Sequence, residues 1–220
     1  QVAALRHEMG LDRPAVTRYV DWLTSMLRGD PGWSYIAKMS VRELIGTRLV
    51  NTLSLAGITA LVSVVLALTI GIASAIDRGG RLDRALNVLT LSLVAMPEFL
   101  IATVLVLIFA VKLAWLPSIA MVSPEATWGE TLRSCALPVM CLAFVVTAQM
   151  ARLTRAAVAD ELDKPYVEMA RLKGVPLRRI VLFHIMPNAA GPVLNAVALS
   201  LSYLMGGAII IETIFSYPGL

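Results

Sequence analysis

The chain has 220 residues, of which 58% are hydrophobic and 15% are charged, and its formal net charge is +4 at pH 7. A disordered chain has low hydrophobicity and high charge, so this composition excludes that class. Soluble domains carry about 25% charged residues. The apolar residues here stand in long runs without a periodic stripe, which indicates a membrane protein. Two cysteines, Cys135 and Cys141, are too few for a disulfide framework and lack a metal-ligand spacing.

Four segments are predicted to cross a bilayer, which takes about 20 apolar residues in a helix. They cover residues 52–76, 86–111, 134–151 and 185–211, and the third of them is short. A soluble core built from these segments would need several helices that are apolar on every face, which is rare. The sequence therefore predicts an all-α, polytopic membrane protein.

The distribution of basic residues predicts the orientation of these spans. Loops 77–85 and 152–184 carry three and seven Lys and Arg residues, against two in 112–133. Basic loops stay in the cytoplasm, so 77–85 and 152–184 are expected there, and residues 1–51 and the C-terminal end outside. Residues 1–51 also carry seven basic residues, but long segments follow this rule poorly.

Glu98 is the one charge within the predicted spans, and it follows Pro97. Charges inside a membrane usually face a cavity or a partner, so Glu98 is a candidate for a pore or cargo-path residue. Alternatively, a shifted span boundary would place it near the surface. Asn188 and Asn195 are seven residues apart and share one face of the last span, where they either line the path or form hydrogen bonds between helices.

Small residues repeat at four-residue spacing in the first span, at Ala67, Gly71 and Ala75. Such a repeat lets helices pack closely, although an alanine-rich chain also produces it by chance. Gly206, Gly207 and Ala208 raise the same question in the last span.

Residues 152–184 are too long for a turn and read as helix, break, helix, break, helix. Pro165 begins a short helix at 166–173, Gly174 ends it, and Pro176 prevents its continuation. A helix this short is not stable alone in water, so it must dock on something. The alternatives are an amphipathic helix on the lipid surface and a docking helix for a cytoplasmic partner. A DNA-binding motif is disfavoured by its place between two spans.

Glu168, Met169 and Ala170, followed by Gly174 and Pro187, resemble the EAA signature of the permease subunits of ATP-binding-cassette importers. That signature reads E-A-A, three residues, G, nine residues, I, one residue, L-P. Met169, His184 and Met186 depart from it. Residues 10–14, 29–35, 95–99, 113–117 and 211–220 are also similar to the dipeptide, oligopeptide and nickel permease subfamily.

The resemblance implies a MetI-like permease bundle in the inner membrane of a bacterium or archaeon. Six spans are then expected in the complete protein, one before residue 1 and one after residue 220. The implied partners are a second permease subunit, two ATPase subunits that bind Mg-ATP, and an extracytoplasmic solute-binding protein. Closure of the ATPases on ATP would move the short helix and switch the pore between its inward-open and outward-open states.

By the same resemblance, coupling to the ATPases is assigned to one group of residues. These are Tyr166, Glu168, Met169, Ala170, Arg171, Gly174 and Pro187. The expected cargo is a di- or oligopeptide, and the alternatives within the family are nickel and glutathione. A stand-alone secondary transporter is less favoured, because it would need coupling charges within its spans and inverted repeats.

The chain is not expected to be an enzyme or to bind a cofactor. It has no G-x-x-x-x-G-K-[ST] loop for ATP and no G-x-S-x-G motif of hydrolases. His7 and His184 stand alone, without the neighbouring ligands that a metal site requires.

Overall fold

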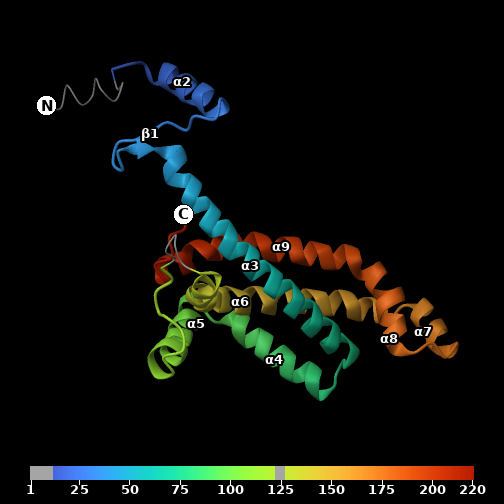
Figure 1. Cartoon of the computed structure of the whole chain (residues 1–220). Helices are drawn as coiled ribbons and strands as arrows, with labels where there is room; N and C mark the ends of the chain where they lie inside the picture. Colours follow the sequence, from blue (N-terminus) through green and yellow to red (C-terminus); the bar gives the residue numbers. More distant parts are fainter. Residues whose placement is uncertain (1–11, 122–126) are drawn as a thin grey trace. The chain divides into compact units, whose positions relative to one another are not determined.

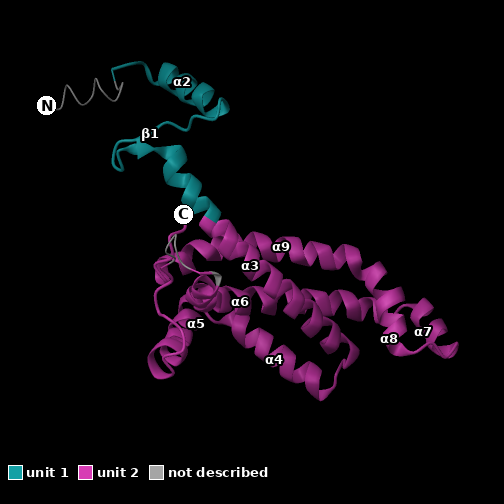
Figure 2. Ribbon diagram, viewed as in Figure 1, with its two compact units in different colours: residues 1–50, 220 teal, residues 51–219 magenta. Residues whose placement is uncertain are grey.

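The computed structural model describes residues 12–121 and 127–220 of the chain. His7 and the first two residues of the 10–14 motif lie outside this described part. The chain divides into two compact units, residues 1–50 with residue 220, and residues 51–219 (Figure 2).

The described residues of the first unit form the helix α2, a short hairpin and the start of a long helix. The helix α2 spans Ala15–Leu27, and none of its residues is buried. Gly29, at φ +84°, ends α2 with the hydrogen-bond pattern that commonly closes helices: its N–H donates to Met26 and that of Asp30 to Ser25. The strands β1 (Trp33–Ser34) and β2 (Met39–Ser40) then pair antiparallel, and α3 (Val41–Ile76) follows.

The second unit is a bundle of helices (Figure 1). It holds the rest of α3, then α4 (Arg81–Ala95), α5 (Glu98–Leu105), the π-helical η1 (Val106–Lys112) and α6 (Trp128–Leu162). These are followed by α7 (Pro165–Leu172), α8 (Leu177–Ile180), the π-helical η2 (Val181–Ile185) and α9 (Met186–Ile214). α6 packs along α9 and also contacts α4 and α5. The predicted all-α class is confirmed for this unit.

Three helical stretches of the described chain are long and apolar enough to span a membrane: Val41–Ile76, Gly129–Leu162 and Leu177–Ile214. The pair Arg81–Ala95 and Glu98–Lys112 makes a fourth span if it counts as one, and its two parts are bent by 106°. Four spans were predicted, but the helices extend beyond the predicted segments, and the second segment is broken. The break falls at Met96 and Pro97, which are both extended.

The break at Met96 has a local cause. Proline lacks an N–H group and its ring disfavours helical geometry in the residue before it. Met96 accordingly has ψ 134° and ends α4, while Pro97 caps the start of α5. The sequence predicts one span over residues 86–111, whereas the structure shows a sharp bend between two separate helices.

The main hydrophobic core lies where α3, α5, α6 and α9 meet. Its buried side chains include Leu55 of α3, Ile101 of α5, Leu142 of α6 and Ile211 of α9. Cys135 and Cys141 are free thiols within this core. Apolar contacts of this kind hold the bundle together by excluding both lipid and water from its interior.

The small residues of α3 mark its closest approach to α6. A Cβ atom on Gly71 would lie 2.8 Å from the Ala151 carbonyl oxygen and 2.8 Å from the Thr154 Cβ. Ala67 and Ala75, one turn away on either side, are also buried. The structure therefore favours close packing over chance as the reason for the repeat.

Candidate functional site

α7 is an eight-residue helix with clear boundaries, close to the predicted range 166–173. Its first residue is a proline, which suits a first turn that needs no N–H donor. At its other end, Gly174 has φ +76°, its N–H donates to the Arg171 carbonyl (2.9 Å), and the Val175 N–H donates to the Ala170 carbonyl (3.1 Å). This is the Schellman pattern, in which a left-handed glycine closes a helix.

One face of α7 is docked on the bundle. Val167 and Ala170 are buried, with 1% and 8% of their surface exposed. They belong to a second hydrophobic cluster, separate from the main core, together with residues from five other elements: Ala75 of α3, Val158 and Ala159 of α6, Ile180 of α8, Val181 and Ile185 of η2, and Ala189 and Val193 of α9. This packing supplies the stability that so short a helix lacks by itself.

The other face of α7 is exposed. Glu168 and Arg171 are exposed, and the apolar side chains of Met169 and Leu172 are 55% and 78% exposed. Large apolar side chains left uncovered on a docked helix mark a surface that another body can cover. The predicted residues Glu168, Met169 and Arg171 therefore lie on this exposed face, whereas Ala170 lies on the docked one.

Tyr166 and Asn188 are brought together beside the docked face of α7. The Tyr166 hydroxyl donates to Glu161 Oε2 of α6 (2.7 Å) and also contacts the Asn188 side chain of α9. Burial, and in second place the hydrogen bond to Glu161, raises the pKa of Tyr166, so its hydroxyl remains a donor at neutral pH. This contact ties α7 to α6 and α9 with a polar link beside the apolar ones.

Pro187 lies in the first turn of α9, directly after the π-helical turn η2. The Asn188 side chain donates to the His184 carbonyl within that turn (2.7 Å). π-helical turns of this kind are rare and occur often at functional sites. Asn195 is exposed two turns further along α9, so both asparagines lie on a face that this chain leaves open.

Glu98 lies at the bend between α4 and α5, far along the bundle from α7. A Cβ atom on Gly207 of α9 would lie 2.8 Å from Glu98 Oε1, so the carboxylate rests against the surface of that glycine. Glu98 Oε2 is buried and has no hydrogen-bond partner among the described residues. The Cys141 thiol donates to the Glu98 carbonyl (3.6 Å). The structure thus places Glu98 at a contact of α5 with α6 and α9, apart from Asn188.

A polar cluster that the sequence reasoning missed lies at the start of α4. The Asp83 carboxylate accepts hydrogen bonds from Ser74 Oγ (2.5 Å), the Gly79 N–H (2.9 Å) and Asn87 Nδ2 (2.7 Å). It also accepts two bonds from the Arg155 guanidinium of α6, at 2.6 and 2.7 Å. We call these five residues the Asp83 cluster. Asp83 itself is only 3% exposed.

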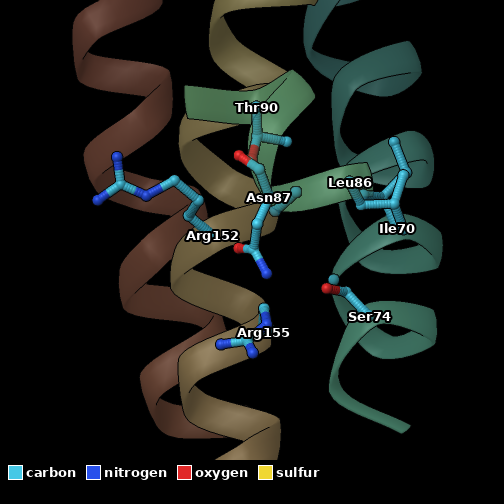
Figure 3. A pocket seen from close by; sticks show the side chains of 9 residues that line it. Ile70, Ser74, Leu86, Asn87, Thr90, Arg152 and Arg155 are labelled. Carbon is cyan, nitrogen blue, oxygen red and sulfur yellow. The ribbon is translucent and has the colours of Figure 1, made fainter. Parts of the chain in front are cut away.

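Figure 3 shows how three helices contribute to the Asp83 cluster. Ser74, Asn87 and Arg155 lie on α3, α4 and α6 around a small pocket, and the neighbouring Arg152 points away from them. The sequence signal for this cluster was an acidic residue in a basic loop next to a span. That signal predicts only the charge of the loop. It does not predict the ion pair of Asp83, because the partner Arg155 lies 72 residues away.

Glu212 near the end of α9 is a second buried carboxylate that the sequence reasoning did not single out. It is 4% exposed, and neither of its carboxylate oxygens has a hydrogen-bond partner in the described part of the chain. Its side chain fills the space beside the Cα of Gly219. Nearby, the Tyr217 hydroxyl donates to the Asn51 carbonyl (3.0 Å), which fastens the C-terminal residues to α3.

Residues 12–121 and 127–220 contain no group of three or more His, Cys, Asp or Glu side chains that could hold a metal ion. His184 is partly buried with one ring nitrogen unpaired, and His7 lies outside the described residues. The described residues therefore offer docking faces, buried polar contacts and a broken span rather than a metal centre.

Comparison with known proteins places these features in a family. Residues 67–220 match the family model of the binding-protein-dependent transport system inner membrane component. The chain is 36% identical over 219 residues to a glutathione transport system permease protein of Pectobacterium atrosepticum. It is 32% identical to a probable peptide ABC transporter permease protein of Sinorhizobium fredii and 34% identical to a putative peptide permease protein of Brucella suis.

These alignments cover the whole of this chain and 69–70% of the length of each relative. They confirm the resemblance that the spaced Glu, Ala, Gly and Pro residues of the α7 region first indicated. A subunit of this kind lies in the inner membrane, crosses it several times, and carries no catalytic centre, since ATP is used by a partner ATPase. The chain therefore belongs to the inner membrane permeases of binding-protein-dependent ABC transport systems.

Proposed function

We propose that this permease forms part of the passage of an ATP-driven peptide importer, and that α7 is the cytoplasmic element through which the ATPase subunits move it. The observation that carries the proposal is the two-sided character of α7. Val167 and Ala170 fix one face to the bundle, while Met169 and Leu172 leave the other face uncovered. A helix held in this way transmits a push on its free face to the spans behind it.

The second hydrophobic cluster supports the transmission step. Val158 of α6 and Val193 of α9 pack in the same cluster as Val167 of α7. Closely packed side chains shift as units, because interiors at this density leave little room for independent movement. A displacement of α7 is therefore passed to two spans at once, and the Tyr166–Glu161 hydrogen bond keeps the register of α7 on α6.

The energetic requirement on the ATPase partners follows from this arrangement. They must bind one state of the permease more tightly than the other, since a partner with equal affinity for both shifts nothing. A change from 1:99 to 99:1 in favour of one state needs about 5.5 kcal/mol of differential binding. Two α7 helices, one from this chain and one from a second permease subunit, would share that requirement between two ATPases.

Di- or oligopeptides are the proposed cargo. Relatives of this chain carry names that refer to peptide and glutathione transport, and glutathione is itself a short peptide. The bend at Glu98 supports this cargo class, because an acidic group in a span can attract the ammonium group of a peptide. Glutathione is retained as the second candidate, on the strength of the relative that is 36% identical. Asn188 and Asn195, on the open face of α9, are proposed to line the path.

The role of α7 is tested at Gly174. A Cβ atom there would meet nothing within 4 Å, so a substitution acts only through the backbone at φ +76°. We expect Gly174→Val to distort the end of α7 and to reduce uptake per ATP hydrolysed. Gly174→Asn is the matched control, because asparagine tolerates the left-handed conformation. Both variants are measured in proteoliposomes that hold the complete transporter, together with Glu168→Ala on the free face.

The readouts are peptide uptake, ATP hydrolysis and the amount of ATPase that co-purifies with the permease. Loss of coupling in Gly174→Val and Glu168→Ala, with Gly174→Asn close to wild type, supports the role of α7. Normal peptide-stimulated hydrolysis and uptake in both Gly174→Val and Glu168→Ala would contradict it.

A further inference from the structure

We infer that the Asp83 cluster carries the movement of α7 to the broken span α4–α5, and that Asp83 and Arg155 are positioning residues for transport. This inference rests on the proposed function of α7. It concerns a different contact, however, because none of the five residues of the Asp83 cluster belongs to α7 or to the second hydrophobic cluster.

Arg155 lies close to the part of α6 on which α7 packs. It lies on α6, two turns before the end of that helix and one turn before Val158 and Ala159, on which α7 packs. A shift of α7 therefore acts on the part of α6 that carries Arg155. Asp163, the residue that ends α6, also contacts Arg78 of the turn between α3 and α4 (2.6 Å).

Asp83 holds the start of α4 in place. It lies in the first turn of α4, and its carboxylate fixes that turn by accepting bonds from Gly79 before the helix and Asn87 one turn into it. Asp77 adds to this by accepting the N–H groups of Leu82 and Asp83. The start of α4 is thereby held as one rigid piece, and the Arg155 guanidinium is its link to α6.

Two ion pairs, Arg78–Asp163 and Arg155–Asp83, connect the end of α6 to the region around the start of α4. The side chains of Arg78 and Asp163 are 54% and 65% exposed, and pairs in such surroundings contribute little. The side chains of Arg155 and Asp83 are 26% and 5% exposed, and the guanidinium binds both carboxylate oxygens. Two parallel charge-assisted bonds fix an orientation as well as a distance. The Asp83–Arg155 pair therefore fixes the first turn of α4 to α6.

The far end of α4 leads to the bend of the broken span. α4 ends at Ala95, and the bend of 106° at Met96 and Pro97 directly precedes Glu98 of α5. A helix that is held at its first turn and ends at a break in the helical backbone can move as a lever. A displacement of α6 at Arg155 is thus passed along α4 to the bend, where the Glu98 carboxylate rests on Gly207.

The test uses the complete transporter in proteoliposomes, with its ATPases and binding protein. In Arg155→Gln, we expect the ATPases to co-purify and to hydrolyse ATP as in wild type, while uptake per ATP falls about tenfold, within the range of about 5- to 150-fold that coupling between sites spans. Arg155→Lys keeps the positive charge but cannot make the two parallel hydrogen bonds. Its uptake per ATP should therefore lie between that of wild type and that of Arg155→Gln. Arg152→Gln is the control, because Arg152 is exposed, one turn away on α6, and has no ion pair among the described residues.

An unchanged ratio of uptake to hydrolysis in Arg155→Gln would overturn the inference. So would an equal fall of uptake and hydrolysis, since a merely structural role predicts that result. If Arg155→Gln fails to assemble, Arg155→Lys decides alone, and a wild-type ratio in it counts against the inference. Failure of the proposed function is distinguishable, because Gly174→Val would then leave uptake per ATP unchanged whatever the Arg155 variants do.

Discussion

Gly207 and Gly206 are neighbours on α9 with different surroundings. A Cβ atom on Gly207 would lie 2.8 Å from Glu98 Oε1, while one on Gly206 would meet nothing within 4 Å. We expect Gly207→Ala to push the Glu98 carboxylate from its position and to lower the initial rate of peptide uptake, and Gly206→Ala to leave the rate unchanged. The measurement is uptake in proteoliposomes at equal ATP hydrolysis.

A double variant shows whether the effect passes through Glu98. Residues in contact are not additive in their effects, so Glu98→Ala combined with Gly207→Ala should be no worse than Glu98→Ala alone. If the two losses instead add, Gly207 acts independently of Glu98. A wild-type rate in Glu98→Ala would remove Glu98 from the proposed cargo path.

Single residues differed in how far the sequence could place them. Gly174 and Pro165 were placed well, because the residue types that start and end helices act through their own backbone. Asp83 could not be placed, because its role depends on Arg155, 72 residues away. Glu98 was identified as a lone charge, but its contact with Gly207 depends on how α5 meets α9.

The packing of α3 on α6 gives a prediction for a pair of helices. Gly71 faces Ala151 and Thr154 at a distance that leaves no space for a Cβ atom, whereas Gly57, on the same helix, faces open space. Gly71→Ala should separate the two helices and lower the midpoint of thermal unfolding in detergent. Gly57→Ala should leave the midpoint unchanged or raise it slightly, because alanine is favoured over glycine in a helix by about 1 kcal/mol. Equal midpoints for the two variants would contradict the close contact.

The boundaries of the elements were predictable where local residues set them and not where the whole fold does. α7 was expected at 166–173 and spans Pro165–Leu172. The third span was predicted to end at residue 151, with a helix at the start of the loop after it; in the structure both form one continuous helix, α6, which runs to Leu162 and whose last turns share a hydrophobic cluster with α7. The break between α4 and α5 has a local cause at Pro97, but the predicted span 86–111 runs through it, because hydropathy averaged over a window does not register a change of direction.

The orientation of the whole chain is open to a labelling test, because its own cysteines are only 4% and 0% exposed and should react little. Ser118 and Lys173 are both exposed; Ser118 is two residues before Ala120, which bonds to Phe215 at the end of α9, and Lys173 directly follows α7, near the start of α9, so Ser118→Cys and Lys173→Cys each place one exposed thiol at opposite ends of the bundle. A membrane-impermeant maleimide should label Ser118→Cys in spheroplasts, and Lys173→Cys only in inside-out vesicles that have been stripped of peripheral subunits. Wild type serves as the control, and labelling of both thiols from one side would contradict the proposed orientation.

The apolar segments and the family were accessible from the sequence because both depend on repeated or spaced local signals. Long apolar runs predicted four crossings, and the described chain has three helical stretches long and apolar enough to cross a membrane, with a bent pair that makes a fourth if it counts as one span. The family was indicated by a few residues at fixed intervals, and the match over residues 67–220 confirms it. The contacts between distant helices, which set the lever from α6 to α4, required the structure.

The widened turn η2 gives the C-terminal span an unusual mechanical property. A π turn holds one more residue than an α turn, and each residue of an α-helix advances the rotation by about 100°. If η2 (Val181–Ile185) tightened into ordinary helix, α9 would twist about its own axis by roughly that angle relative to α8. Asn188 and Asn195 would then swing together from one side of the span to another. Such a rotation would also turn the buried stripe of α9, from Ala189 to Ile211, away from its present partners, so it requires α6 and α5 to move with it.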